Sequence, residues 1–252
     1  MSKYASKDVG FMLLGGYSVL GATSKIEDTV SLNLNETPAL GEADESYWSS
    51  GAKKTEVTQD GWFDDSVGSI HDSLVGLPVT ALPMSIAPHG NVKGRMFDGY
   101  PSVQRVGYTK QIAVGDVQKA QGKYGIYYGK RVGTIVHELA TESTAGNSDG
   151  AYVDLGVAGP GNGGGIFVHI TAAGGTAAPT NITIGLRHSA TSGSGYAAKI
   201  DTGVILFTAI PATSGLWVPF SGALNRYVSA SWAYTGGTAP TVTFALGVYV
   251  AP

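Results

Sequence analysis

The chain has 252 residues, a formal net charge of -3 and no cysteine. This length supplies enough material for one large domain or two lobes, each with a core. The near-neutral charge argues against a general nucleic-acid binder, and the lack of thiols excludes disulfide frameworks and thiolate sites. The 37 glycines, the 11 prolines and the frequent Thr, Val and Tyr residues favour an all-β protein with many turns.

The first half of the chain is predicted to consist mostly of strands. The apolar run at residues 11–14 is too short for a signal-peptide core or a membrane span, so we expect neither a leader nor a membrane anchor. Glycine-containing turns are predicted at residues 90–91, 98–99 and 121–122. Apolar alternation predicts strands over residues 29–34, 55–63, 79–87, 103–108, 111–117 and 124–139.

Two segments of the first half depart from this strand pattern. Acidic and hydroxyl residues precede apolar residues spaced i, i+3 and i+7, which predicts one short helix over residues 64–75. A polar loop is predicted over residues 35–51, and loops of this length are usually functional or disordered. Its aromatic residues, Tyr47 and Trp48, are candidates for subunit contacts, although Trp48 could equally pack beneath its own loop.

The last third gives the clearest strand signals. A period of two places apolar residues on one side of strands at residues 166–170, 181–188, 228–234 and 242–250. Trp232 and Tyr234 share a face with Val228, so we expect them in a core. Gly-, Ala- and Pro-rich turns separate these runs, which is typical of a β-sandwich. Charge falls away near residues 141–147, so the chain is divided into an N-terminal β module (1–144) and a C-terminal β-sandwich lobe (145–252).

Charge is distributed unevenly along the chain. Residues 27–72 hold eleven carboxylates against two lysines, whereas residues 93–131 hold eight bases against two acids. Both segments could be solvated faces, or they could pair head to tail between copies. The candidate acidic residues for ring stacking or for a lumen are Glu36, Glu42, Asp44 and Glu45, and the candidate complementary bases are Lys119, Lys123, Lys130 and Arg131.

No segment assembles a catalytic, metal or cofactor site. Residues 159–164 match a dinucleotide-binding glycine pattern, but a strand follows them where that pattern needs a helix. The five histidines lack metal-ligand spacing, although His169 and His188 could meet across neighbouring strands. We therefore expect no enzyme activity, no metal and no cofactor.

Several short segments follow one another in a distinctive order. They are Ile26-Glu27-Asp28-Thr29, Gly61-Trp62-Phe63-Asp64-Asp65, residues 69–74, Arg187-His188-Ser189-Ala190 and residues 225–232. In this order, over roughly residues 10–250, the chain resembles the major tail tube proteins of long-tailed, non-contractile bacteriophages. One departure is Ser229, which stands where the family's last motif has a second arginine.

The resemblance implies a β-sandwich or barrel with one flanking helix. Six copies would form a ring in which each contributes strands to an inner β-barrel, and rings would stack head to tail into a virion tail tube. Other tail proteins would bind the tube ends, and viral DNA would pass through the lumen without specific binding. The subunit would be synthesised in the host cytoplasm.

Two alternatives remain open on the sequence. A capsid decoration or head-tail connector protein would share the β-rich composition but would not polymerise alone. A carbohydrate-binding tail protein would use aromatic residues of the C-terminal lobe as a sugar platform.

Overall fold

The structure is a computed structural model that describes residues 9–20, 23–36, 47–62, 81–111, 118–159, 161–203, 205–206 and 214–252, with the backbone alone for residues 30–36, 47–54 and 205–206. The predicted helix at 64–75 lies outside these residues. No helix in the described part of the chain is long and apolar enough to cross a bilayer.

The regular secondary structure of the described chain is nearly all β-strand, which confirms the all-β prediction, and its helical element is a three-residue 3-10 turn, Asp149–Ala151. The strands of the first half are β1 (Phe11–Leu14), β2 (Tyr17–Ser18), β3 (Thr23–Glu36), β4 (Tyr47–Trp62), β5 (Leu82–Ala87), β6 (Met96–Gln111), β7 (Lys119–Ile126) and β8 (Arg131–Glu142). Those of the second half are β9 (Gly146–Asn147), β10 (Val153–Asp154), β11 (Gly164–Ala177), β12 (Asn181–Ser189), β13 (Ala197–Asp201), β14 (Ile205–Leu206), β15 (Ser214–Phe220), β16 (Tyr227–Thr235) and β17 (Thr238–Val250).

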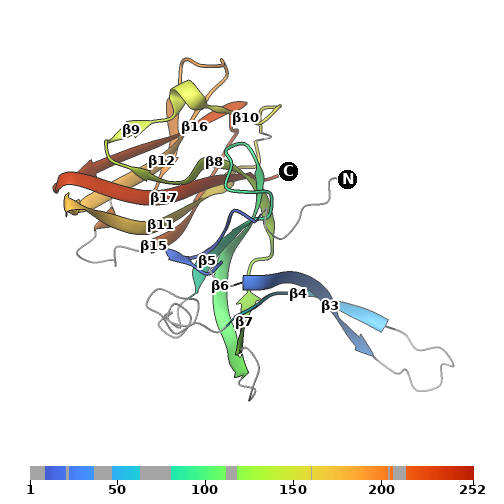
Figure 1. The fold of residues 1–252 in the computed structure, drawn as a ribbon. Coiled ribbons are helices and arrows are strands. Elements are labelled where there is room, and N and C mark those ends of the chain that lie inside the picture. The colour runs from blue at the N-terminus through green and yellow to red at the C-terminus, as the bar shows by residue number, and fades with distance from the viewer. Residues whose placement is uncertain are drawn as a thin grey trace.

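Two antiparallel sheets form the sandwich at the upper left of Figure 1. The larger sheet runs β15-β11-β17-β8-β6-β5-β1-β2, and the smaller runs β10-β16-β12-β13. Alternate residues of β11 and β17 pack against alternate residues of β12 and β16, as in the contact of Ile170 and Phe244 with Ile184 and Trp232 in one core. Trp232 is buried and Tyr234 is half-buried against this core, as predicted.

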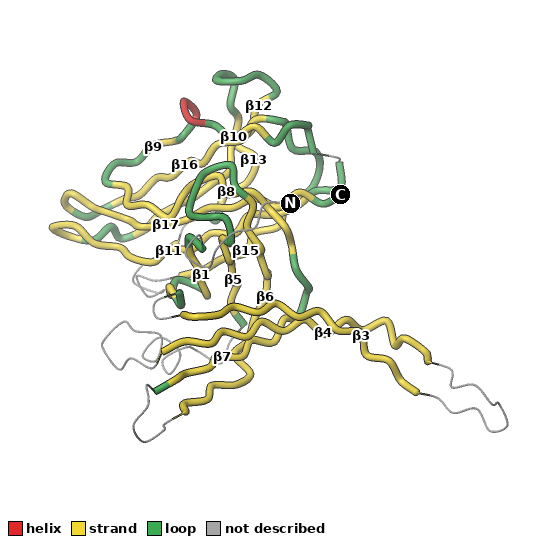
Figure 2. Tube along the Cα trace, turned by 45° about the vertical axis from the view of Figure 1, so that its right-hand side comes forward, coloured by secondary structure: helices red, strands yellow, loops and turns green. Residues whose placement is uncertain are grey.

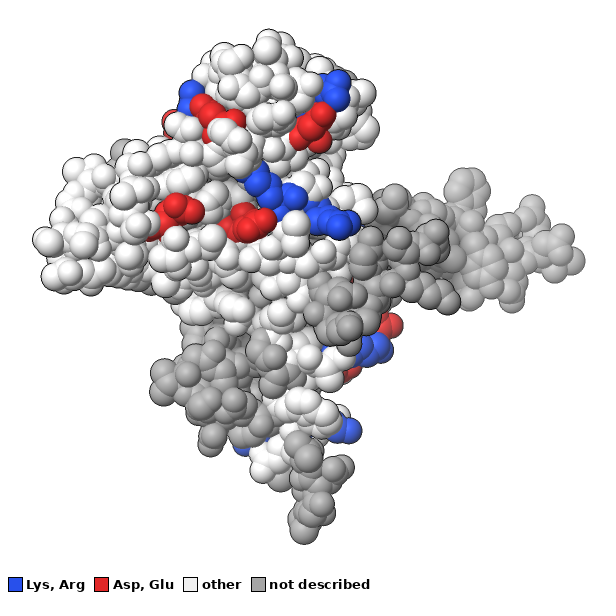
Figure 3. Space-filling view, turned by 45° about the horizontal axis from the view of Figure 1, so that its top comes forward, with Lys and Arg blue, Asp and Glu red and all other residues white. Residues whose placement is uncertain are grey.

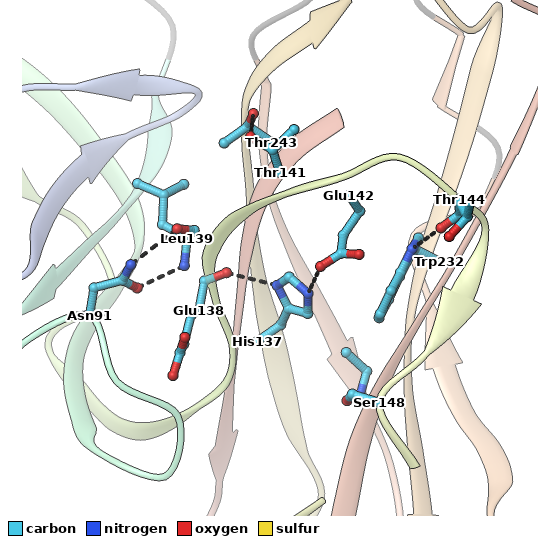
Figure 4. Close-up of polar contacts among 11 residues, drawn as sticks. Asn91, His137, Glu138, Leu139, Thr141, Glu142, Thr144, Ser148, Trp232 and Thr243 are labelled. Atoms are coloured by element: carbon cyan, nitrogen blue, oxygen red, sulfur yellow. Dashed lines mark hydrogen bonds and ion pairs between the residues drawn. The ribbon is translucent and has the colours of Figure 1, made fainter. Parts of the chain in front are cut away.

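Strand β8 connects the two halves of the chain. It pairs with β17 along most of its length and with β6 near its start, so hydrogen bonding crosses the predicted boundary at residue 145. Figure 4 shows how its end is held: the Asn91 side-chain oxygen accepts from the Leu139 amide at 2.7 Å, and His137 Nε2 lies 3.2 Å from a Glu142 carboxylate oxygen. The His137 ring stacks on Phe244 at 4.2 Å between ring centroids.

Strand β1 shows why a short apolar run is needed near the N-terminus. All four of its residues are buried. Phe11 and Leu13 enter a cluster with Phe97 and Phe167, whereas Met12 and Leu14 enter a second cluster with Tyr100 and Tyr124. Alternation along four residues therefore serves two cores, one on each face of the strand.

Three predicted features of the first half differ from the structure. The predicted strand over 124–139 is two strands, β7 and β8, separated by a turn in which Gly129 has a φ of 71°. The predicted turns at 98–99 and 121–122 lie inside β6 and β7. Gly99 is explained by packing, because a Cβ there would lie 2.6 Å from the Phe167 ring.

Both ends of the polar loop predicted over 35–51 belong to strands, and residues 37–46 lie outside the described residues. Strand pairing reaches Glu36 opposite Tyr47 and continues through Asn35 opposite Trp48, so Tyr47 and Trp48 belong to β4. Figures 1 and 2 show this β3–β4 hairpin extending away from the rest of the molecule. Strand β7 joins β4 over residues 55–62, so the outer part of the hairpin has no described strand beside it.

Candidate assembly surface

Strands β3, β4, β7 and β6 form a four-stranded antiparallel branch of the larger sheet. Residues that pair across strands point to the same face, so the register sorts the side chains into two sets. One set lies on the side of the core. Val57, Tyr124 and Arg105 form one cross-strand row of this set, and Val57 and Tyr124 are buried in the core. The opposite set forms what we call the polar face, consisting of Lys25, Glu27, Thr29, Glu56, Thr58, Asp60, Trp62, Lys119, Gln121, Lys123, Gly125, Gln104, Thr109 and Gln111.

A buried hydrogen-bond network fixes the core side of this branch. The Gln59 side-chain amide donates to the Val19 carbonyl and to the Thr23 hydroxyl, and its oxygen accepts from the Tyr124 hydroxyl at 2.8 Å. Burial raises the pKa of Tyr124, so its hydroxyl stays protonated and can donate. This network positions β3, β4 and β7 relative to the turn before β3.

Acids and bases alternate across the polar face. Lys123 lies directly opposite Thr58, which places it diagonally between Glu56 and Asp60. Asp60 accepts from the Gln121 amide at 2.7 Å, and Lys25 contacts Glu27 at 2.6 Å. The hydrogen bond and the charge of Glu27 raise the pKa of Lys25. Strands β3 and β4 are thus mainly acidic on the described part of this face, and β7 is basic.

A hollow of about 400 Å³ lies at one end of the branch. Trp62, at the end of β4, is 46% exposed beside it, and Lys119, at the start of β7, is its cross-strand neighbour. Lys25, Asp60, Gln111 and Gln121 also line the hollow. Because the described β3–β4 pairing begins with Thr23 opposite Gly61 and ends with Glu36 opposite Tyr47, the hollow and the Glu36–Tyr47 pair lie at opposite ends of the same strands.

Lys130, which lies between β7 and β8, links β3 to the first part of β6. Its ammonium lies 3.0 Å from an Asp28 carboxylate oxygen and 2.8 Å from an Asp98 carboxylate oxygen. Burial opposes the charge, but the hydrogen bonds to Asp98 and Asp28 outweigh it and raise the pKa of Lys130. The cation therefore separates two carboxylates that would otherwise face each other.

We expect Lys130→Met to lower the free energy of unfolding by about 1–3 kcal/mol, because it leaves two partly buried carboxylates without their shared cation. Urea unfolding at neutral pH measures the change. The exposed Lys123, replaced by Met in the same way, is the control and should shift stability by no more than about 0.5 kcal/mol. Equal effects of the two substitutions would contradict the role assigned to Lys130.

The candidate residues from the sequence are placed as follows. Lys119 and Lys123 are exposed on the polar face, but Lys130 is used within the chain. Arg131 lies over the Tyr249 ring at 5.1 Å, away from the polar face. Glu36, Tyr47 and Trp48 are placed by their backbone in the hairpin. Glu42, Asp44 and Glu45 lie outside the described residues.

The two histidines considered as a pair do not meet. His169 is on β11 of the larger sheet and His188 is on β12 of the smaller one. His169 bonds Gly15 and Ser85, and His188 accepts from the Asn225 amide. Among the described residues, no group of three His, Asp or Glu side chains could hold a metal ion.

No family model matches the chain, and no curated protein matches it. Among solved structures, a chain from the virion of a native gene transfer agent particle is 8% identical with a TM-score of 0.36, over 52% of this chain and 98% of that chain. A chain from the tail of an empty gene transfer agent particle with C6 symmetry is 8% identical with a TM-score of 0.36, over 51% and 97%.

The SPP1 Dit protein, described as a paradigm of hub adsorption apparatus in phages that infect Gram-positive bacteria, is 9% identical with a TM-score of 0.36, over 96% of this chain and 99% of that chain.

Proposed function

We propose that the protein is a structural subunit of a phage tail tube, in which copies form a ring and rings stack around a lumen for viral DNA. The observation that carries the proposal is the four-stranded branch β3-β4-β7-β6. One of its faces packs on a core and the other is charged and accessible. A sheet of this kind can form one segment of a barrel whose interior is polar.

The edges of the branch support closure by repetition. Among the described strands, β3 pairs with β4 alone, and β6 beyond Val103 pairs with β7. The strands alternate in direction, so β3 and β6 run in opposite senses. Rotation about a ring axis keeps these directions, so β6 of one copy would meet β3 of the next in the antiparallel arrangement used throughout the branch. Pairing of this kind would also remove both exposed edges.

The charges of the polar face suit a passage for DNA. Its described acids, Glu27, Glu56 and Asp60, are matched by Lys25, Lys119 and Lys123. The lysines are interleaved with carboxylates and form no continuous basic track, so the face would hold phosphate weakly. The inner wall of the tail tubes that the sequence resembles is often acidic, whereas this face carries charges of both signs.

Cross-linking tests the ring directly, because the chain has no cysteine of its own. The double variant Glu27→Cys, Thr109→Cys places one thiol on β3 and one on β6, both exposed on the polar face. With a short bis-maleimide linker, we expect a ladder of cross-linked oligomers that ends at the closed ring. The sequence resemblance implies a ring of six copies. Electron microscopy of the same sample should show a pore.

The control variant carries Glu27→Cys with Ser192→Cys, an exposed residue in a turn of the sandwich. It should give no closed ladder. A monomer that resists cross-linking in both variants would reject the ring. A poreless trimer or pentamer would favour a decoration protein instead.

A further inference from the structure

Three large apolar side chains are exposed together beside strand β6. Val106 is 61% exposed, Tyr127 is 61% exposed and Tyr128 is 69% exposed. Such groups are usually scattered singly on a soluble protein, and contiguous ones mark interaction sites. We refer to Val106, Tyr127 and Tyr128 as the β6 patch.

The contacts around the β6 patch place Val106 and Tyr127 on neighbouring positions, and Tyr128 follows Tyr127 in the turn. Strand β6 bulges between Arg105 and Gly107, which directs Val106 over Gly125 of β7, where a built Cβ would lie 2.9 Å from a Val106 methyl. The Tyr127 hydroxyl donates to Gln104, the residue that pairs with Gly125. The Tyr127 amide donates to the Ser102 carbonyl at 3.1 Å. The bulge and the turn therefore present the patch on the polar face, beside β6.

Open strand edges select the occupant. Among the described strands, β6 beyond Val103 pairs with β7 on one side, and β3 pairs with β4 alone. The outer edge of β6 thus lies on one side of the branch and the outer edge of β3 on the other. A second copy of this chain presents its β3 edge in the antiparallel direction that β6 accepts.

We infer that the β6 patch anchors the contact with strand β3 of a second copy, an inference that rests on the proposed ring. Tyrosine is enriched at the centres of protein interfaces, where its ring is desolvated and its hydroxyl keeps a partner. Tyr127 already has that partner in Gln104. On β3, the side chains that share the polar face are Lys25, Glu27 and Thr29, whose aliphatic stems and methyl group can cover the rings.

The test compares the double variant Tyr127→Ser, Tyr128→Ser with the wild-type chain by sedimentation velocity and electron microscopy. We expect self-association to weaken by about tenfold or more, with a monomer whose circular dichroism and unfolding midpoint match the wild type. Val106→Ser should weaken association in the same direction. The control is Val157→Ser, since Val157 is 73% exposed away from the branch and its loss should leave association unchanged.

The outcomes distinguish the proposal that the β6 patch anchors the contact from the proposal that copies form a ring. If the double variant assembles as the wild type does while the β3–β6 cross-link ladder persists, the anchor is wrong and the ring stands. If the wild type neither assembles nor gives the ladder, both are wrong. If Val157→Ser weakens association as strongly as the patch variants, the contact lies elsewhere and the anchor is overturned.

Discussion

Replacing His169 with glutamine is expected to remove about 3 kcal/mol of the stability that the wild-type protein loses between pH 6.5 and pH 4. His169 is 1% exposed on β11, and its Nδ1 donates to the Gly15 carbonyl at 2.6 Å. Its Nε2 accepts from the Ser85 hydroxyl at 2.8 Å. This places one neutral ring between the sandwich strand β11, the turn after β1 and strand β5.

Burial is the main cause of the shift in this histidine. It lowers the pKa of His169 from 6.5 to about 4, against the opposing effect of the Gly15 carbonyl. The side chains that line its small cavity are Phe11, Ser85, Phe97, Ile135, Ala245 and Leu246, none of which is charged. No neighbouring carboxylate among these residues can stabilise a protonated ring.

The sign of the effect follows from the order of protonation. As pH falls below 6.5, the unfolded chain binds a proton at this histidine before the folded protein does, so stability decreases. The contribution is fully present above pH 6.5 and is lost as pH approaches 4. Over that interval the loss is about 3 kcal/mol for one group.

Denaturant unfolding at several pH values, for the wild type and His169→Gln, measures the difference in slope. Ser85→Ala is the matched control, because it removes a hydrogen bond but keeps the titrating ring. It should lower stability by about 1 kcal/mol and leave the pH slope in place. A glutamine variant with the wild-type slope would show that other groups cause the acid sensitivity.

Side-chain alternation explains where the sequence predicted the fold well. In β12, Ile182, Ile184 and Leu186 are fully buried, and the residues opposite Ile184 and Leu186 are Trp232 and Ala230. Both strands bury one face and expose the other, so the period of two is visible in the residues themselves.

Glycine was the main source of error, because its role depends on tertiary neighbours. Gly99 was predicted to lie in a turn, yet it lies inside β6, where the Phe97 and Phe167 rings occupy the space that a Cβ would need. The opposite error occurred at Tyr127 and Tyr128, whose aromatic character suggested a continuing strand although they form the β7–β8 turn. Local preference cannot separate these cases.

The surface was less predictable than the core for a similar reason. The Lys130 contact with Asp28 joins residues 102 apart in the chain, and nothing in either local sequence distinguishes it from an exposed lysine. The β6 patch depends on a bulge, which is a property of strand pairing. Val106 was the one local indication of the patch in the predicted strand 103–108. A valine at this position is equally typical of a strand residue that faces the core.

The charge reversal Glu42→Lys, Asp44→Lys, Glu45→Lys is expected to stop tube growth while leaving rings intact. These three residues follow β3 in the chain and are proposed to meet basic residues of the next ring. Within the branch, β3 begins beside the hollow, where Thr23 pairs with Gly61, and ends where Glu36 pairs with Tyr47. If the strands run roughly along the tube, the hairpin end of one ring faces the hollow end of the next.

This geometry reduces the number of basic residues that could contact the acidic segment of a neighbouring ring. Lys130 is held by Asp28 and Asp98, and Arg131 lies against Tyr249, so neither is suited to the contact. Lys123 lies within the polar face between Glu56 and Asp60. Lys119 lies at the start of β7 on the wall of the hollow, where an acidic segment of a neighbouring ring could reach it.

Rescue therefore distinguishes the lysines. Lys119→Glu in the triple-reversal background should restore tube growth, because it recreates opposite charges at the rim of the ring. Lys123→Glu in the same background should not, because its charge lies inside the face. Electron microscopy measures tube length, and light scattering measures growth at low and high salt. Tubes of normal length from the triple variant would reject the charge contact, and rescue by Lys123→Glu alone would place the contact on the polar face instead of at the rim.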